Sequence, residues 1–580
     1  MAAADVVDVE GVVEERPGVL VGAPGAPAAG PPLVAGGGRP QTGTIEPIEE
    51  APALSRGRTI SILIGVLLGM LLSSLDQTIV GTAMPRVVAE LNGLSHYAWV
   101  FTAYMLGSTV MVPIYGKLSD IYGRRWFFLG GMALFLFGSA LSGLSQSMTQ
   151  LILFRGVQGL GAGAIMPIAI AIIGDIFSPA ERGRWQGVMM AVFGLASIVG
   201  PALGGWITDT WGWRWVFYVN MPVGVVAMIG AGLTLPKHSQ HRRHTIDYAG
   251  AATLVAAAVP LLLAFSWAGS EYPWASPQVI GLLVFSTLMA VTFVFIERRA
   301  PEAIISPALF RNRIFTVSVM ATFLVSGGMF GATMYLPLFA QGVVGVSAAQ
   351  AGAALTPLML GFMVSSTIGG QILSRTGRYK YLALSGFVVA TIGMIMLSRM
   401  DASVTTGTVI RNTAITGLGI GMMMSLFTIV VQNAFSIDRL GQVTASLQFY
   451  RSIGGTSSVA LLGTVLTNSF QNAFLNSLPE AVRALIPAAQ LEALGNPQIL
   501  IAPESTSSIQ QTFAALGPQG QAAFLQLMEV IRSSLATAIT GIFLAGAAAM
   551  VIGFCITLFL PEIPLRKGRA RVPGASVPVD

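Results

Sequence analysis

The sequence contains a single cysteine, Cys555, so an intramolecular disulfide is excluded. Charged residues are also scarce: they make up 10% of the 580 positions, against 53% for hydrophobic residues, and the mean hydropathy is +0.71. A soluble domain needs many more charges to cover its surface. The composition therefore predicts a polytopic, all-α membrane protein.

Two motifs of hydrolytic enzymes are missing, namely the GxxxxGK[ST] phosphate loop and the HExxH zinc motif. We therefore expect no enzyme activity, no catalytic residue and no cofactor, and pumping by ATP hydrolysis within this chain is not expected. His238, His241 and His244 have a regular spacing, but the three basic residues among them would repel a cation. A solvated loop is the preferred interpretation, and no metal site is predicted.

Apolar runs of about 20 residues, each long enough to cross a hydrocarbon core about 30 Å thick, recur along the chain. Most of the 32 Lys and Arg residues fall on the side that holds both termini, which the positive-inside rule makes cytoplasmic. The net charge of +6 reflects this asymmetry, and no nucleic acid partner is expected. The location predicted is the bacterial cytoplasmic (inner, plasma) membrane. The fourteen predicted spans are 59–81, 97–115, 126–145, 150–174, 185–207, 214–235, 247–267, 277–296, 314–340, 348–373, 380–398, 406–434, 440–466 and 535–560.

An acid, Asp76, lies within the first span, where an unpaired charge costs a few kcal/mol or more. It shares a helix face with small and polar residues such as Ser73, so it is predicted to point into the bundle. At about 1.5 Å per residue, Asp76 and Arg155 of the fourth span lie at matching depths, about 8 Å from the outer end. We expect the two side chains to pair and to form a proton-coupling site. The alternatives are a purely structural pair and an Arg155 that snorkels to the interface.

The loop 116–125, GKLSDIYGRR, joins the second and third spans and contains Gly116, Asp120, Gly123, Arg124 and Arg125. On its charges alone it could be a basic loop with a solvated ion pair. The spacing of the five residues resembles the signature loop of the major facilitator superfamily. That resemblance implies a conformational latch: Asp120 pairs near Arg124 and faces the backbone amides at Gly441 and Gln442, which locks the two halves in the outward-facing state.

Further stretches resemble the fourteen-helix drug/proton antiporter family of this superfamily. They are LDQTIVGTAMP in the first span, RGVQGLGAG in the fourth and WRWVFYVNMPVG at the start of the sixth. GPALGG, with Gly200, Pro201, Gly204 and Gly205, is similar to the fifth-helix antiporter motif, which implies export, although Ala196 replaces its usual leading glycine. A packing kink without a role in transport is the alternative for these four residues.

The stretch 369–380, GGQILSRTGRYK, is a degraded copy of the signature loop, as expected for an internally duplicated transporter. The predicted organisation has two six-helix halves, at 58–236 and 313–562, and two inserted helices at 237–312. A disordered cytoplasmic tail is expected at 1–57 and a second cytoplasmic tail at 563–580. An extracytoplasmic excursion is expected at 467–534 and is predicted as a hairpin of amphipathic helices. It caps the outer vestibule, docks a partner or is inert.

Arg451 in the thirteenth span lies about 16 Å from the inner end, without an acid at similar depth in the second half. A fixed interhelical bond is the preferred interpretation, and an anionic ligand in the cavity is the alternative. The overall prediction is a monomeric, proton-driven exporter of small hydrophobic or amphipathic compounds, as in multidrug efflux. The alternatives are an exporter of an endogenous lipid or secondary metabolite, and a membrane sensor that binds a ligand without moving it.

Overall fold

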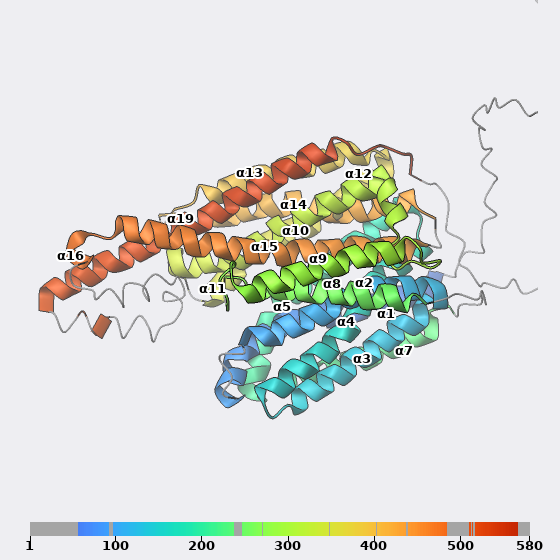
Figure 1. Ribbon diagram of the computed structural model, residues 1–580, viewed down its shortest axis with the longest axis horizontal. Helices are drawn as coiled ribbons and strands as arrows, with labels where there is room; N and C mark the ends of the chain where they lie inside the picture. Colours follow the sequence, from blue (N-terminus) through green and yellow to red (C-terminus); the bar gives the residue numbers. More distant parts are fainter. Residues whose placement is uncertain are drawn as a thin grey trace, which may run out of the picture. The chain divides into compact units, whose positions relative to one another are not determined.

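The computed structural model describes residues 56–91, 97–236, 246–269, 271–346, 348–401, 403–436, 439–483, 510–511, 513 and 517–565 (Figure 1). The predicted tail at 1–57 except its last two residues, the histidine triplet, the centre of the excursion and most of the tail at 563–580 lie outside the described residues. Within the described ranges the regular secondary structure is helical, and the β-bridge between Ala268 and Tyr272 is isolated. The predicted all-α class is confirmed.

The described helices follow one another in chain order. They are α1 (Arg56–Leu91), α2 (Tyr97–Tyr122), α3 (Arg124–Leu144), α4 (Met148–Ile176), α5 (Pro179–Thr210), α6 (Trp215–Tyr218), α7 (Asn220–Thr234), α8 (Tyr248–Trp267), α9 (Pro277–Glu297), η2 (Pro307–Arg311), α10 (Arg313–Phe339), η3 (Ala340–Val344), α11 (Ala348–Ala353), α12 (Thr356–Thr376), α13 (Tyr379–Ser398), α14 (Thr406–Ala434), α15 (Leu440–Ser477), α16 (Glu480–Arg483) and α19 (Gly517–Thr557).

Twelve helical segments among the described residues are long and apolar enough to cross a membrane. They coincide with twelve of the predicted spans. The second and thirteenth predicted spans correspond to α2, of 26 residues, and α15, of 38 residues. The number fourteen itself stays a prediction.

The packing partners of the first helices recur among the last ones. Helix α1 packs against α5 and α7, and α4 packs against α2 and α3. In the same way α10 packs against α15 and α19, and α14 packs against α12 and α13. This repetition is the pattern that a duplicated transporter produces. The exact predicted boundaries of the halves stay a prediction.

Several contacts join the first group of helices, α1 to α7, to the second group, α10 to α19. Helix α5 packs against α12, and α2 packs against α15. The inserted pair α8 and α9 pack against each other, and α8 also touches both α2 and α15 (Figure 1). The inserted pair therefore lies beside the seam between the two groups.

The predicted excursion at 467–534 differs from the structure at both of its ends. Helix α15 continues to Ser477 and α19 begins at Gly517, so the helices of the two spans extend into it. The buried side chains of Phe470, Phe474, Leu527 and Ile531 share one hydrophobic cluster. The sequence predicts a separate hairpin here, but residues 521–534 belong to the long helix α19, which packs against α15.

Candidate functional site

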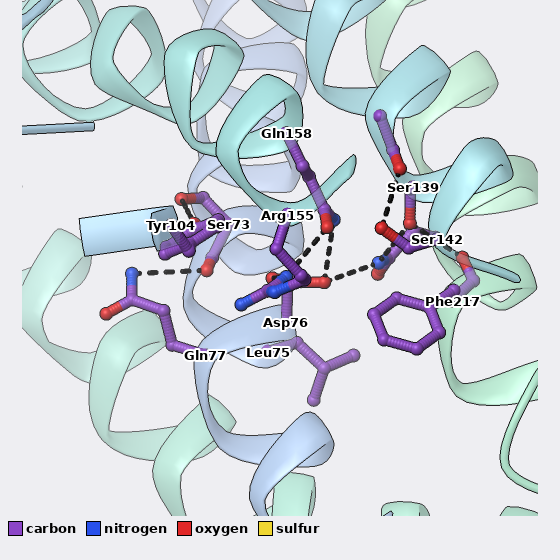
Figure 2. A network of polar contacts seen from close by, with 12 residues as sticks. Ser73, Leu75, Asp76, Gln77, Tyr104, Ser139, Ser142, Arg155, Gln158 and Phe217 are labelled. Carbon is purple, nitrogen blue, oxygen red and sulfur yellow. Dashed lines mark hydrogen bonds and ion pairs between the residues drawn. The ribbon is translucent and has the colours of Figure 1, made fainter. Parts of the chain in front are cut away.

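Asp76 of α1 and Arg155 of α4 form a buried ion pair, with Arg155 Nη1 at 2.6 Å from Asp76 Oδ2 (Figure 2). The exposed fraction of the side chain is 0% for Asp76 and 1% for Arg155. The predicted pairing is therefore present, and the alternative of a snorkelling Arg155 is wrong. Its role in proton coupling stays a prediction.

The other oxygen of this carboxylate accepts two amide hydrogen bonds. Gln158 of α4 donates to Asp76 Oδ1 at 2.8 Å, and Asn220 of α7 donates to the same oxygen at 2.9 Å. Asn220 also donates to the Ser139 hydroxyl of α3 at 3.0 Å. Helices α1, α4 and α7 thus meet at one acid, α3 is joined to it through Asn220, and donors satisfy both carboxylate oxygens (Figure 2).

The guanidinium of Arg155 is held on several sides. Its Nη1 also donates to Gln158 Oε1 at 2.7 Å, and its Cζ lies 4.2 Å from the centroid of the Tyr104 ring. A cation over an aromatic face is attracted by the ring quadrupole. Arg155 Nε is buried and has no hydrogen-bond partner in the structure.

Glycines bring these helices close enough for short polar side chains to meet. A Cβ at Gly138 of α3 would overlap with the backbone of Gln158, and a Cβ at Gly159 of α4 would overlap with the carbonyl of Tyr104. Small residues allow close helix contact within a membrane. The RGVQGLGAG motif therefore both supplies Arg155 and Gln158 and places α4 against its neighbours.

The start of the sixth span is anchored at the predicted outer end of α1. Trp213 Nε1 donates to Glu90 Oε2 at 2.8 Å, and Arg214 forms an ion pair with the same carboxylate. Glu90 lies beyond the candidate span Gly57–Met84. The hydrogen bonds from Arg214 and then Trp213 lower the pKa of Glu90 below its usual range. This anchor fixes the chain that leads to Asn220.

The glycines of the fifth-helix motif lie against α1, close to Asp76. A Cβ at Gly200 would overlap with the hydroxyl of Thr78, and a Cβ at Gly204 would overlap with that of Thr82. A Cβ at Gly205 would meet nothing within 4 Å. Pro201 lies in the same helix, α5. The Thr78 hydroxyl also donates to the carbonyl of Ala196 at 3.1 Å, where the family motif has a glycine.

Residues of the signature loop hold the end of α2 against the beginning of α15. Asp120 accepts hydrogen bonds from the backbone N–H of Gly441 at 2.9 Å and of Gln442 at 2.6 Å, and it forms an ion pair with Arg124. Arg124 also pairs with Asp175 at the end of α4, at 2.9 Å. The expected contacts of Asp120 are thus all present, while its role as a latch stays a prediction.

The other three residues of the loop have distinct positions. A Cβ at Gly116 would overlap with Ala445 of α15, so this glycine allows α2 and α15 to touch. Gly123 has a φ of 96°, which favours glycine, and it separates α2 from α3. Arg125 donates to the carbonyl of Leu235 at 3.3 Å.

A second close contact between the two groups of helices lies at the same end as the signature loop. A Cβ at Gly183 of α5 would lie 2.6 Å from the Cα of Gly370 in α12. Gly183 is in the first turns of α5, and Gly370 is in the last turns of α12. The seam is therefore closed at the predicted cytoplasmic end, by α2 with α15 and by α5 with α12.

Arg451 is buried between α14 and α15. Its guanidinium donates to Gln448 Oε1 at 3.0 Å, to the carbonyl of Met424 at 3.2 Å and to the Thr428 hydroxyl at 3.3 Å. Among the described residues it has no ion pair. Its Nε is buried without a hydrogen-bond partner. The neutral partners match the preferred interpretation of an interhelical bond.

Sequence reasoning did not assign three residues of these sites. In the sequence, Gln158 and Asn220 stand out only as members of the motifs RGVQGLGAG and WRWVFYVNMPVG, and Asp175 belongs to none of the motifs. A buried amide and an acid at a helix end are weak signals, because neither residue type identifies its partner. In the described part of the chain no group of three or more His, Cys, Asp or Glu residues is arranged to hold a metal.

Comparisons with known proteins agree with this architecture. The family model described as "Major Facilitator Superfamily" matches residues 66–459. The chain is 39% identical to the multidrug transporter protein MdtP of Bacillus subtilis (strain 168) over 522 residues, which covers 88% of this chain and 94% of the relative. It is 37% identical to multidrug resistance protein 3 of the same organism over 511 residues, which covers 88% and 95%.

A solved structure supports the fold. The proton:xylose symporter XylE superposes with a TM-score of 0.55 at 12% sequence identity, which covers 89% of this chain and 99% of that chain. At this identity the likeness concerns the fold alone.

Proposed function

Because the chain belongs to the major facilitator superfamily and is a membrane transporter of the multidrug-efflux type, we propose that it exports small hydrophobic or amphipathic compounds in exchange for protons. The observation that carries the proposal is the buried ion pair of Asp76 and Arg155. An ionised carboxylate away from water is costly unless it is paired and hydrogen-bonded. Asp76 has both kinds of partner, so it can exist as an anion inside the bundle.

A proton on Asp76 would remove the charge that Arg155 neutralises. Arg155 would then be left with Gln158 and the Tyr104 ring as neutral partners. The protonated and ionised states of this site therefore favour different arrangements of α1, α4 and α7. If the cargo binds better to one arrangement, the cargo and the proton must influence each other's affinity equally.

The contact of α1 with α5 offers a route from Asp76 to the seam between the two groups of helices. Thr78 is two residues beyond Asp76 and lies against Gly200 of α5. The other end of α5 meets α12 at Gly183 and Gly370. A displacement of α1 around Asp76 would thus also displace α5, which reaches the predicted cytoplasmic end of the seam.

We assign the structure to the outward-facing state of an alternating-access cycle. At the predicted cytoplasmic end, Asp120 of α2 accepts from the first amides of α15, and Gly116 lies against Ala445. A helix N-terminus attracts an acid, since its first amides have no partner within the helix. In the inward-facing state these contacts would have to break, and Asp120 would act as the latch.

The charge balance of the groups buried deep within the spans suggests which cargo is preferred. Asp76 and Arg155 neutralise each other, whereas Arg451 has neutral partners only. A dication would need a further acid at the depth of these groups to compensate its desolvation. Neutral, monocationic and weakly anionic amphiphiles are therefore the proposed cargo, whether these are drugs or an endogenous lipid or metabolite.

The remaining parts of the proposal concern location and assembly. We place the protein in the bacterial cytoplasmic membrane as a monomer, with both termini in the cytoplasm. The ends of α15 and α19 within 467–534 would then project on the outer side, where a partner could dock.

Transport in everted membrane vesicles tests the proposal. With a pH gradient imposed, vesicles that contain the wild-type protein should accumulate a fluorescent amphipathic cation, and those with Asp76→Asn should not. Asp209→Asn is the matched control, because Asp209 is exposed near the end of α5. Gradient-driven uptake by Asp76→Asn would contradict proton coupling, and a wild type that binds the dye without moving it would indicate a sensor.

A further inference from the structure

A short segment between α9 and η2, residues 302–304, contacts both sides of the closed seam. From α2, Lys117 Nζ forms an ion pair with Glu302 Oε2 at 2.6 Å. From α15, Gln442 Nε2 donates to the carbonyls of Ala303 at 2.7 Å and of Ile304 at 3.0 Å. This segment directly follows the inserted helix pair α8 and α9. The signature loop and the coupling site both lie outside that pair.

Gln442 connects this segment directly to the latch. Its backbone N–H donates to Asp120 Oδ2 at 2.6 Å, while its side chain holds Ala303 and Ile304. Lys117 is three residues before Asp120, and both residues lie in α2. The contacts therefore form a closed ring, which runs from α2 through residues 302–304 to α15 and back to α2.

The segment is also fixed to the inserted pair. Glu297 ends α9, its side chain is buried, and its Oε1 accepts a hydrogen bond from the backbone N–H of Ile304 at 3.2 Å. Within the pair, the Ser286 hydroxyl of α9 donates to the carbonyl of Ala257 in α8 at 2.7 Å. The segment is thus attached to a helix hairpin that packs beside the seam.

A shared hydrophobic cluster adds to these polar contacts. Val112 of α2, Leu254 of α8, Phe293 of α9 and Phe449 of α15 are buried together, along with Ile304. A cluster built from both sides of the seam and from the inserted pair loses part of its buried area when α2 and α15 separate. We call the contact of α2 with α15 at the predicted cytoplasmic end the gate. The inserted pair therefore interacts differently with the closed gate and with the open gate.

We propose that the inserted helices are a working part of the gate: residues 302–304 clasp α2 to α15 and stabilise the state that is closed at the predicted cytoplasmic end. Lys117, Glu302 and Gln442 are the positioning residues of this clasp. The inference rests on the proposed function only in that α2 and α15 must separate during transport. A contact present in one state and absent from the other shifts the equilibrium between the two.

Cysteine accessibility in the purified full-length protein tests the clasp. In a Cys555→Ser background, Val112→Cys provides a near-isosteric probe that is buried in the shared cluster. Labelling by a maleimide in detergent reports how often α2 and α15 separate, regardless of membrane sidedness. Gln442→Leu keeps the backbone donor to Asp120 and removes the side-chain donors to the clasp, so labelling should become about 2- to 10-fold faster.

The ion pair allows a rescue experiment. Lys117→Glu and Glu302→Lys should each speed labelling, and the double variant with exchanged charges should return it toward the wild-type rate. Gln471→Leu, at an exposed position of the same helix as Gln442, should leave labelling unchanged. Return of the rate in the double variant would attribute the effect of the single variants to the ion pair between these two residues.

The outcomes separate this inference from the proposed function. Unchanged labelling in Gln442→Leu and in both charge variants would refute the clasp, even if Asp76→Asn abolishes proton-driven export. If instead Asp76→Asn transports normally while the clasp variants label faster, proton coupling through Asp76 is wrong and the clasp stands.

Discussion

Gly200 of α5 lies so close to Thr78 of α1 that a methyl group on the glycine would overlap with the threonine hydroxyl. Thr78 is two residues from Asp76, so this contact joins the buried acid to α5. The other end of α5 meets α12 at the predicted cytoplasmic end of the seam. Any side chain at Gly200 must push α1 and α5 apart just where Asp76 is held.

The glycine motif gives a prediction with an internal control. Gly200→Ala and Gly204→Ala should each destabilise the protein by about 1–3 kcal/mol, since an added carbon overpacks the contact of α5 with Thr78 and Thr82. Gly205→Ala should be neutral or slightly stabilising, because its Cβ would meet nothing within 4 Å. Thermal unfolding of the purified variants measures the difference. Equal destabilisation by all three would show that close packing against Thr78 and Thr82 does not explain the motif.

Asp120 is predicted to hold the gate closed. Asp120→Asn removes the negative charge that faces two backbone amides and Arg124, and hydrogen bonds to charged groups contribute about 1.5–3 kcal/mol. The Val112→Cys probe should therefore be labelled about tenfold faster or more in Asp120→Asn than in the parent. The matched substitution Asp209→Asn should have no effect. An unchanged labelling rate would mean that Asp120 does not stabilise the closed gate.

Arg451 leads to a prediction on the charge of the cargo. An uncompensated buried charge costs several kcal/mol, so a divalent lipophilic cation should compete for export at least about tenfold more weakly than a monovalent one of similar size. Competition against a fluorescent monocation in vesicles measures the two inhibition constants. Equal or stronger competition by the dication would rule out the charge argument.

The anchor at Glu90 predicts a pH-dependent contribution to stability. The pKa of Glu90 is lower in the folded protein than in the unfolded chain, so the contribution is present at neutral pH and is lost as the pH falls through the folded-state value. Glu90→Gln should therefore lower the unfolding temperature slightly at pH 7. The difference from wild type should vanish at a pH well below about 4. A difference that persists in acid would assign the effect to packing against Trp213 and not to charge.

Residue type and helix depth were sufficient to predict the central contacts of the candidate site. An acid and an arginine at the same depth in the membrane have few other groups that could neutralise their charges. The structure pairs Asp76 with Arg155. The partners of Asp120 followed from the family resemblance, because free amides at the start of a helix attract an acid.

Other features could not be predicted because they depend on which helices are neighbours. Asn220 reaches Asp76 across 144 positions of the chain, and Lys117 reaches Glu302 across 185. The depth of a residue in its span does not say which helices are neighbours. The partners of Asn220 and of Lys117 therefore cannot be identified before the helices are placed relative to one another. The extension of α15 was missed for a related reason, since hydropathy marks the membrane part of a helix and not its end.

Proton release on cargo binding tests the central claim most directly. In weakly buffered detergent solution, adding a saturating amphipathic cation to the purified wild-type protein should release protons that a pH indicator detects. Asp76→Asn should bind the same compound, as shown by a shift in its unfolding temperature, without releasing protons, while Asp209→Asn should behave as wild type. Equal proton release by Asp76→Asn and wild type would contradict the assignment of Asp76 as the site where proton and cargo are coupled.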